Sequence, residues 1–207
     1  VAIGSDAALG LALAHVMVRD ELFDRRFVSE QTDLPLLVRR DTGRFLRQSD
    51  LQKNGAEDVL FLFDRRSGEV REAPRASLAL GALDPALEGE YRVRTLAGEV
   101  AVTPVFALLR ERLAAYTPEQ ASRITGTDPR QIERLARALA KARAASAITQ
   151  TDFSKFYHGL EMERAQLLAF ALAGQIGKKG AGVAALSFLS ISGPDALAVA
   201  SGKLPPK

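Results

Sequence analysis

The residues best suited to chemistry gather in one polar segment, TDFSKFYH. It carries hydroxyls at Thr151 and Ser154, a cation at Lys155 and an imidazole at His158. The segment follows an apolar run over 144–149 that predicts a buried strand. In open α/β sheets, ligands bind at the carboxyl ends of the strands. The segment is therefore a candidate ligand-binding loop, in which Lys155 can stabilise developing negative charge.

A second group of candidates, Gly4, Ser5 and Asp6, precedes a helical pattern over 7–19. Glycine permits close backbone approach, and the amides at a helix start favour an anion. A carboxylate at Asp6 can accept N–H donors from guanine or the hydroxyl of a ribose, so the group suits a ligand with a nucleotide end. An ordinary helix cap, with Ser5 or Asp6 accepting from first-turn amides, explains the same residues, and spacing alone favours it.

Other polar features have simpler explanations. Lys155 is also explained as a solvated lysine, and His158 as a hydrogen-bonded structural histidine beside Tyr157. The run GKKGAG at 177–182 follows a helical pattern and lacks the order of a phosphate loop, so a glycine stop is favoured. His15 lies among apolar residues and fits a packed helix position. No pair of acids supports acid–base catalysis, and no catalytic residue is assigned.

The elements that would position these residues follow the order of an α/β layer. Helices are predicted over 7–19, 24–30 and 159–173. Another helix is predicted to start at Pro104, with Val105 on its buried face, and two more are predicted to start after Thr117 and after Asp128. Hairpins with glycine in the turn are predicted at 64–69 and 96–99. The sequence thus predicts a Rossmann-like α/β layer with an inserted hairpin-rich β segment.

The predicted layer is incomplete. The chain divides into a first α/β piece (1–33), a hairpin-rich insertion (34–102), a second α/β piece (103–191) and an irregular tail (192–207). Only residues 1–3 and 144–149 read as parallel strands, and two strands do not form a stable parallel sheet. The 159–173 helix is apolar on nearly every side, which predicts burial within something large. We therefore expect a piece of a larger subunit.

The composition excludes several kinds of site and partner. The chain of 207 residues has 28 basic and 25 acidic side chains, scattered among one another, which does not favour nucleic acid as a partner. It contains no cysteine, so it holds neither a disulfide nor a thiolate-bound iron–sulfur cluster. Two histidines do not make a metal site of ordinary zinc spacing. No apolar run reaches the roughly 18 residues of a membrane helix, so direct membrane insertion is not expected.

Two motifs resemble one family. They are GSDAALGLALAHV at 4–16 and SKFYHG, which lies within the run from Ile148 to Gly182. They are similar to the catalytic subunits of the molybdopterin oxidoreductases, the dimethyl sulfoxide reductase family. The resemblance is strongest to respiratory nitrate, selenate and perchlorate reductases and ethylbenzene dehydrogenase, where Gly-Thr-Asp-Ala-Ala-Leu and Ser-Lys-x-Tyr-His-Gly runs are familiar. Ser5 replaces the usual threonine and keeps the hydroxyl.

The resemblance implies a molybdenum-dependent oxidoreductase that binds bis(molybdopterin guanine dinucleotide) for two-electron chemistry such as oxygen-atom transfer or hydroxylation. Gly4, Ser5 and Asp6 match positions that contact the guanine dinucleotide. Thr151 and Lys155 match the second set of cofactor-contacting positions, with Ser154 and His158 beside them. The metal ligand and an iron–sulfur cluster are expected elsewhere in the full subunit, and an iron–sulfur electron-transfer subunit is the expected partner.

Two alternatives stay open at the level of sequence. The same fold can act as a non-catalytic scaffold in an electron-transfer complex, although retention of Thr151, Ser154 and Lys155 favours the catalytic interpretation. An independent nucleotide-binding domain would require the chain to fold alone. The substrate and the compartment, on the periplasmic or the cytoplasmic face of a membrane, are not determined by these residues.

Overall fold

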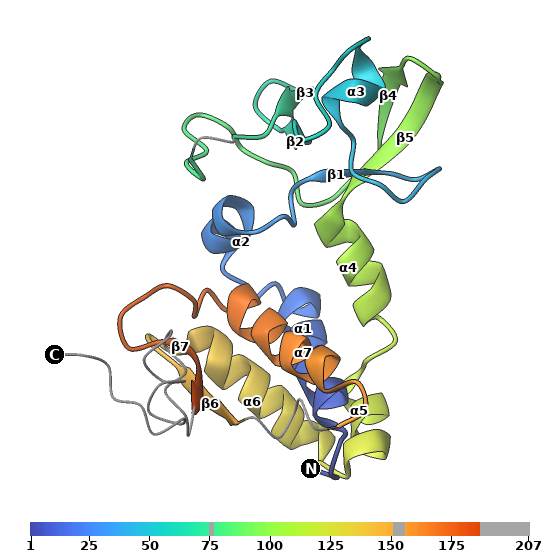
Figure 1. The fold of residues 1–207 in the computed structure, drawn as a ribbon. Helices are drawn as coiled ribbons and strands as arrows, with labels where there is room; N and C mark the ends of the chain where they lie inside the picture. Colours follow the sequence, from blue (N-terminus) through green and yellow to red (C-terminus); the bar gives the residue numbers. More distant parts are fainter. Residues whose placement is uncertain (75–76, 151–155, 187–207) are drawn as a thin grey trace, which may run out of the picture.

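The computed structural model describes residues 1–74, 77–150 and 156–186, which form two units (Figure 1). A helical unit contains the residues before 36 and after 104, and a β unit contains the residues between them. The helices of the described chain are α1 (Asp6–Arg19), α2 (Arg25–Gln31), α3 (Gln48–Leu51), α4 (Val105–Leu113), α5 (Pro118–Thr125), α6 (Pro129–Lys141) and α7 (Gly159–Leu172). Its strands are β1 (Leu37–Arg39), β2 (Phe61–Asp64), β3 (Glu69–Glu72), β4 (Tyr91–Thr95), β5 (Gly98–Pro104), β6 (Ser146–Gln150) and β7 (Gly182–Leu186).

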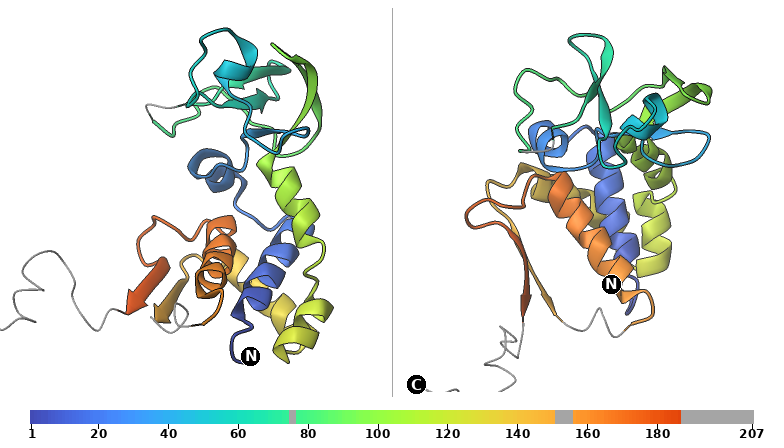
Figure 2. Two further views of the ribbon diagram at one scale, coloured as in Figure 1. Left: turned by 45° about the vertical axis from the view of Figure 1, so that its right-hand side comes forward. Right: turned by 45° about the horizontal axis from the view of Figure 1, so that its top comes forward.

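Helix α1 is the centre of the helical unit and contacts α4, α5, α6 and α7 (Figure 2). Small and aliphatic residues allow this burial, and Ala12, Val16 and Met17 have no exposed surface. A methyl group placed on Gly10 would lie 2.8 Å from the backbone carbonyl carbon of Ala165, closer than side-chain carbons approach in practice. The absent side chain of Gly10 therefore lets α1 and α7 pack backbone against backbone.

Thr117 and Asp128, which the sequence marked as helix starts, do cap helices, and Asp24 caps a third. The hydroxyl of Thr117 accepts from the backbone N–H of Gln120 (3.2 Å) at the start of α5. The carboxylate of Asp24 accepts from the N–H of Phe27 (2.9 Å), and Asp128 caps α6 in the same way. These bonds satisfy first-turn amides that have no partner within the helix.

The β unit is antiparallel, as the turn signals predicted. One sheet has the order β1-β5-β4, and β2 pairs with β3 as a separate hairpin. The hairpin register pairs Phe61 with Glu72 and Asp64 with Glu69, which confirms the turn predicted at 64–69. The second predicted hairpin is β4–β5, with Thr95 opposite Gly98. A small core of its own fills the unit, formed by Leu37, Leu46, Val59, Phe61, Val93 and Val102.

Strands β6 and β7 form a parallel pair, with α7 between them in sequence. Ser146 lies opposite Gly182, and the pairing continues to Gln150 and Leu186. The sequence predicted β6 but not β7, because GVAAL has mostly small side chains and continues the glycine-rich end of α7. The described chain is thus mixed α/β with small sheets, which confirms the predicted class.

Three details differ from the sequence expectations. Residues 1–3 do not form a strand: the N–H of Ala2 donates to the carbonyl oxygen of Thr125 (2.7 Å), and a turn begins at Ile3. Helix α4 buries Phe106 more deeply than Val105, because the Phe106 ring packs against Phe23 with centroids 4.8 Å apart.

The third difference concerns α7, which the sequence predicted to be buried nearly all round. Met162 and Ala169 are buried against the helical unit, but Leu160 and Leu167 are 64% and 39% exposed. One apolar face of α7 is therefore uncovered in the described chain. The predicted division at residues 33, 102 and 191 stays a prediction, and the predicted tail lies outside the described residues.

Candidate functional site

The turn before α1 does not form the cap that spacing alone favoured for Ser5. Gly4 has a φ of 77°, a conformation that favours glycine. Ser5 is the N-cap residue, but its hydroxyl donates to the carbonyl oxygen of Ala2 (2.6 Å), and among the described residues no side chain caps the helix. Asp6 is half-buried in the first turn. The start of α1 therefore combines uncapped amide donors with a carboxylate acceptor, which suits a ligand carrying both acceptors and donors.

The start of α1 lies against the end of the polar segment. A methyl group placed on Gly4 would lie 4.0 Å from Cδ1 of Phe156, which precedes α7. The N-terminus and the start of α7 accordingly share one end of the helical unit (Figure 2). The tertiary structure thus brings together two motifs that are far apart in the sequence.

His158 lies at this end as the N-cap residue of α7. Its φ of 61° is left-handed, a strained conformation for a residue with a side chain. The imidazole is largely exposed, packs edge-on against Tyr157 and lies 3.8 Å from a carboxylate oxygen of Glu161. Among the described residues, His158 thus has ring and charge contacts with Tyr157 and Glu161 but no hydrogen bond of the kind that the structural alternative required, and the ring is accessible.

Near the end of strand β6 lies a polar side chain, Thr149, that the sequence prediction did not use. Thr149 is 2% exposed, and its hydroxyl has no hydrogen-bond partner among the described residues. Burying a hydroxyl without a partner is costly, and such groups are often paired in the functional state. The next candidates, Thr151, Ser154 and Lys155, lie outside the described residues.

Two other polar features have structural roles. Helix α7 ends at Leu172, before Gly174, which has a φ of 62°. The glycine that ends the helix is therefore Gly174 and not the GKKGAG run, which leads into strand β7 at its last residue, Gly182. A phosphate loop needs a helix after it, so the run is not a phosphate loop. Nδ1 of His15 lies 2.9 Å from the carbonyl oxygen of Leu113, which makes His15 a packed helix residue as predicted.

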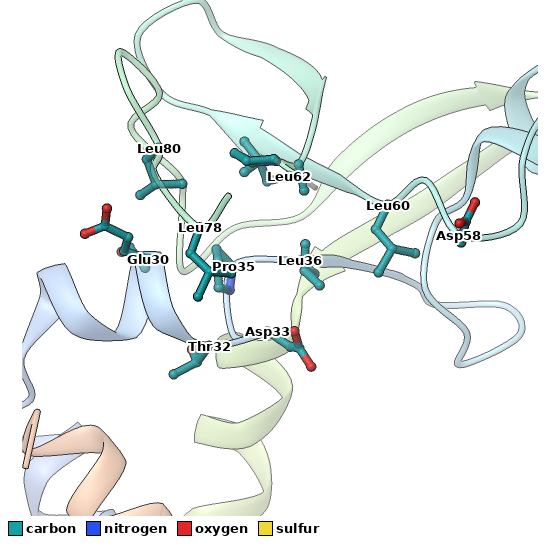
Figure 3. Close-up of a pocket in the computed structure, with 13 residues that line it drawn as sticks. Glu30, Thr32, Asp33, Pro35, Leu36, Asp58, Leu60, Leu62, Leu78 and Leu80 are labelled. Atoms are coloured by element: carbon teal, nitrogen blue, oxygen red, sulfur yellow. The ribbon is translucent and has the colours of Figure 1, made fainter. Parts of the chain in front are cut away.

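A separate pocket of about 170 Å³ lies between α2 and the β2–β3 hairpin (Figure 3). Leucine side chains, including Leu36, Leu62 and Leu80, form its walls, and Glu30 and Asp33 lie at its edge. None of the residues predicted from the sequence lines this pocket. It offers an apolar recess with carboxylates but no paired acid and base.

Residues 1–74, 77–150 and 156–186 contain no cluster of three or more His, Cys, Asp or Glu side chains suited to holding a metal ion. No helix in this part of the chain combines the length and the apolar character that spanning a membrane requires.

Comparison with known proteins gives a consistent set of relatives. No family model matches the chain. Perchlorate reductase subunit alpha of Dechloromonas aromatica is 36% identical over 207 residues, covering 87% of this chain and 22% of the relative. Dimethylsulfide dehydrogenase subunit alpha of Rhodovulum sulfidophilum is 34% identical over 183 residues, covering 86% of this chain and 20% of the relative. Respiratory nitrate reductase subunit alpha of Haloferax mediterranei is 36% identical over 197 residues, covering 87% of this chain and 20% of the relative. The chain therefore spans about a fifth of the length of these relatives.

Proposed function

Because this chain belongs to the molybdopterin oxidoreductase family, we propose that it is a cofactor-binding part of a longer molybdenum-dependent catalytic subunit. The proposed cofactor is bis(molybdopterin guanine dinucleotide), held in a Rossmann-like layer. When bound, it supplies two-electron redox chemistry such as oxygen-atom transfer or hydroxylation. The proposed partners are the remainder of the subunit and an iron–sulfur electron-transfer subunit.

The proximity of Gly4 and Phe156 carries this proposal. The start of α1 and the start of α7 lie at one end of the helical unit, where the first sequence motif begins and the second ends. A dinucleotide cofactor is long and needs contacts from separate segments, so this convergence favours a shared ligand over two unrelated helix starts.

The chemistry of the donors and acceptors at this end fits the proposed cofactor. The carboxylate of Asp6 accepts N–H donors from guanine, and the amides at the start of α1 favour a phosphate. The exposed ring of His158 and the buried, unpartnered hydroxyl of Thr149 add a stacking surface and a hydrogen-bonding group. Lys155 is proposed to hold negative charge near the pterin. The role of these residues is to bind and orient the cofactor.

The proposal is tested by measuring the cofactor content of the full-length subunit. Molybdenum is measured by metal analysis, and the guanine nucleotide released by acid is measured by mass spectrometry. We expect Asp6→Ala to lower the ratio of guanine nucleotide to protein. Glu119→Ala is the matched control, because it removes an exposed acid from the first turn of another helix, α5. Absence of both molybdenum and guanine nucleotide from the native subunit would overturn the proposal.

A scaffold role predicts a different result at Lys155. Under the catalytic proposal, Lys155→Ala slows substrate turnover while the subunit still assembles. Under the scaffold interpretation, the same substitution leaves electron transfer through the assembly unchanged. Turnover equal to that of the native enzyme, with native cofactor content, would remove Lys155 from the site.

A further inference from the structure

A wide groove runs along α1 and α7 on the face next to α2. We call it the α1–α7 groove, and its volume is about 780 Å³. Leu11 of α1, Phe27 of α2, and Leu167 and Leu168 of α7 line it, and Ile176 lies after the end of α7. Both views of the ribbon show α1 and α7 side by side beneath α2 (Figure 2). The groove is therefore a large, mostly apolar surface on the helical unit.

Exposed apolar side chains are concentrated in this unit. Leu160 and Leu167 of α7 are exposed, as are Leu135 of α6 and Ile148 of β6. In the described β unit, the large apolar side chains that are exposed are Leu78 and Leu96. Soluble proteins rarely leave wide apolar surfaces in water, and such surfaces mark interfaces. Of these exposed residues Leu167 lies in the groove itself, and the groove is the apolar surface of this unit best suited to receive another structural element.

The comparisons indicate where that element comes from. About 87% of this chain matches only 20–22% of perchlorate and nitrate reductase alpha subunits. A longer subunit supplies a covering segment within the same chain, without the entropy cost of recruiting a second molecule. A second copy of this chain would instead have to present an apolar surface of its own at each site.

The walls of the groove indicate the kind of element. Most of the lining side chains belong to α1, α2 and α7, whose backbone N–H and C=O groups are largely bonded within each helix, and Thr32, Tyr116 and Ile176 complete the lining from the segments between helices. An extended strand placed there would bury backbone groups without partners, which is costly. A helix satisfies its own backbone and packs its apolar side chains between those of its neighbours. Glu161 and Arg164 also line the groove and can pair with polar residues flanking an apolar helix face.

We propose that an apolar helix from the remainder of the same catalytic subunit occupies the α1–α7 groove. This inference rests on the proposed function, because both require a longer subunit. It goes further by naming the surface and the type of element that covers it.

Thiol labelling of the full-length subunit tests the inference. Leu167→Cys places a thiol in the groove, and Leu96→Cys places one at the exposed β4–β5 turn. This chain has no cysteine of its own, so each new thiol is assigned by peptide mass spectrometry. For Leu167→Cys we expect labelling in the folded subunit at least about tenfold slower than in urea, since labelling requires local opening. We expect Leu96→Cys to show much less protection.

The possible outcomes separate the two proposals. Folded-state labelling of Leu167→Cys within about twofold of its rate in urea overturns the groove inference. If that subunit still contains molybdenum and guanine nucleotide, the proposed function stands. Protection without molybdenum or guanine nucleotide supports the groove inference and removes the proposed function. Protection that is lost on dilution overturns the inference in favour of a second copy of the chain.

Discussion

Gln175 provides the sharpest test of how the candidate site is positioned. Its side chain has no exposed surface and lies between the end of α6 and the start of β6. Oε1 accepts from the N–H of Ala145 (3.0 Å), and Nε2 donates to the carbonyl oxygen of Ala142 (2.8 Å). These two bonds therefore fix the chain just before β6, the strand that carries Thr149.

We predict that Gln175→Leu weakens the attachment of β6 to α6. Leucine has nearly the same size as glutamine, so the main effect is two backbone groups left without partners. Each such group costs about 1–3 kcal/mol when buried. Two such groups would cost about 2–6 kcal/mol if fully buried. Ala142 and Ala145 are only half-buried, so we expect a total loss in the lower half of that range, about 2–4 kcal/mol.

Native-state hydrogen exchange of the peptide covering 142–150 measures the free energy of local opening at β6. Gln131→Leu is the matched control, because it removes an exposed amide that bonds Arg134 (2.6 Å) on α6. That control should change the opening free energy by less than about 0.5 kcal/mol. If Gln175→Leu gives the same small change, the buried amide does not hold the strand and the reasoning is refuted.

A second variant, Gln175→Glu, tests the same hydrogen bonds through the pH dependence of stability. At neutral pH the carboxylate cannot donate to Ala142, and burial raises its pKa in the folded protein. Stability of this variant should therefore be lost as pH rises through that raised pKa and recover as pH falls. A pH-independent difference from the native protein would contradict this.

Three further predictions concern other positions. The carboxylate of Asp64 accepts hydrogen bonds from backbone N–H groups, of which that of Asp84 has the largest effect, and they lower its pKa from 3.8 to about 2. This carboxylate therefore stabilises the fold above pH 3.8, and the stabilisation is lost as pH falls towards 2. Asp64→Asn should lower the urea midpoint at neutral pH by an amount that shrinks over this interval, and a constant difference would argue against it. Gly10→Ala should destabilise by about 1–3 kcal/mol, because the new methyl group meets the backbone of Ala165, even though alanine favours a helix; a higher melting temperature would show that α1 and α7 do not pack this closely. His158→Gly should raise stability by about 0.5–1 kcal/mol by relieving a φ of 61°, while cofactor content falls if the ring contacts the cofactor; a lower melting temperature would disprove the strain.

The sequence predicted helix starts and hairpin turns well, because each of these is set by residues that are neighbours in the chain. Caps at Thr117 and Asp128 and the glycine turns of both hairpins marked real boundaries, because they depend on neighbouring residues. Strand β7 was missed because its existence depends on pairing with β6, which a local pattern of small residues does not indicate. The burial of Phe106 was missed for a similar reason, since it depends on Phe23 from a distant segment.

The sequence by itself determined the family, the α/β class and the two motifs that were singled out as cofactor-binding, because these depend on residue identity and short-range order. Only the three-dimensional structure decided that Gly4 and Phe156 lie together, that the hydroxyl of Ser5 bonds Ala2 instead of capping α1, and that Thr149 buries a hydroxyl with no partner among the described residues. The approach of Gly4 to Phe156 is a contact between segments far apart in the chain. It accompanies the packing of α1 on α7 through Gly10, and no local pattern encodes that approach.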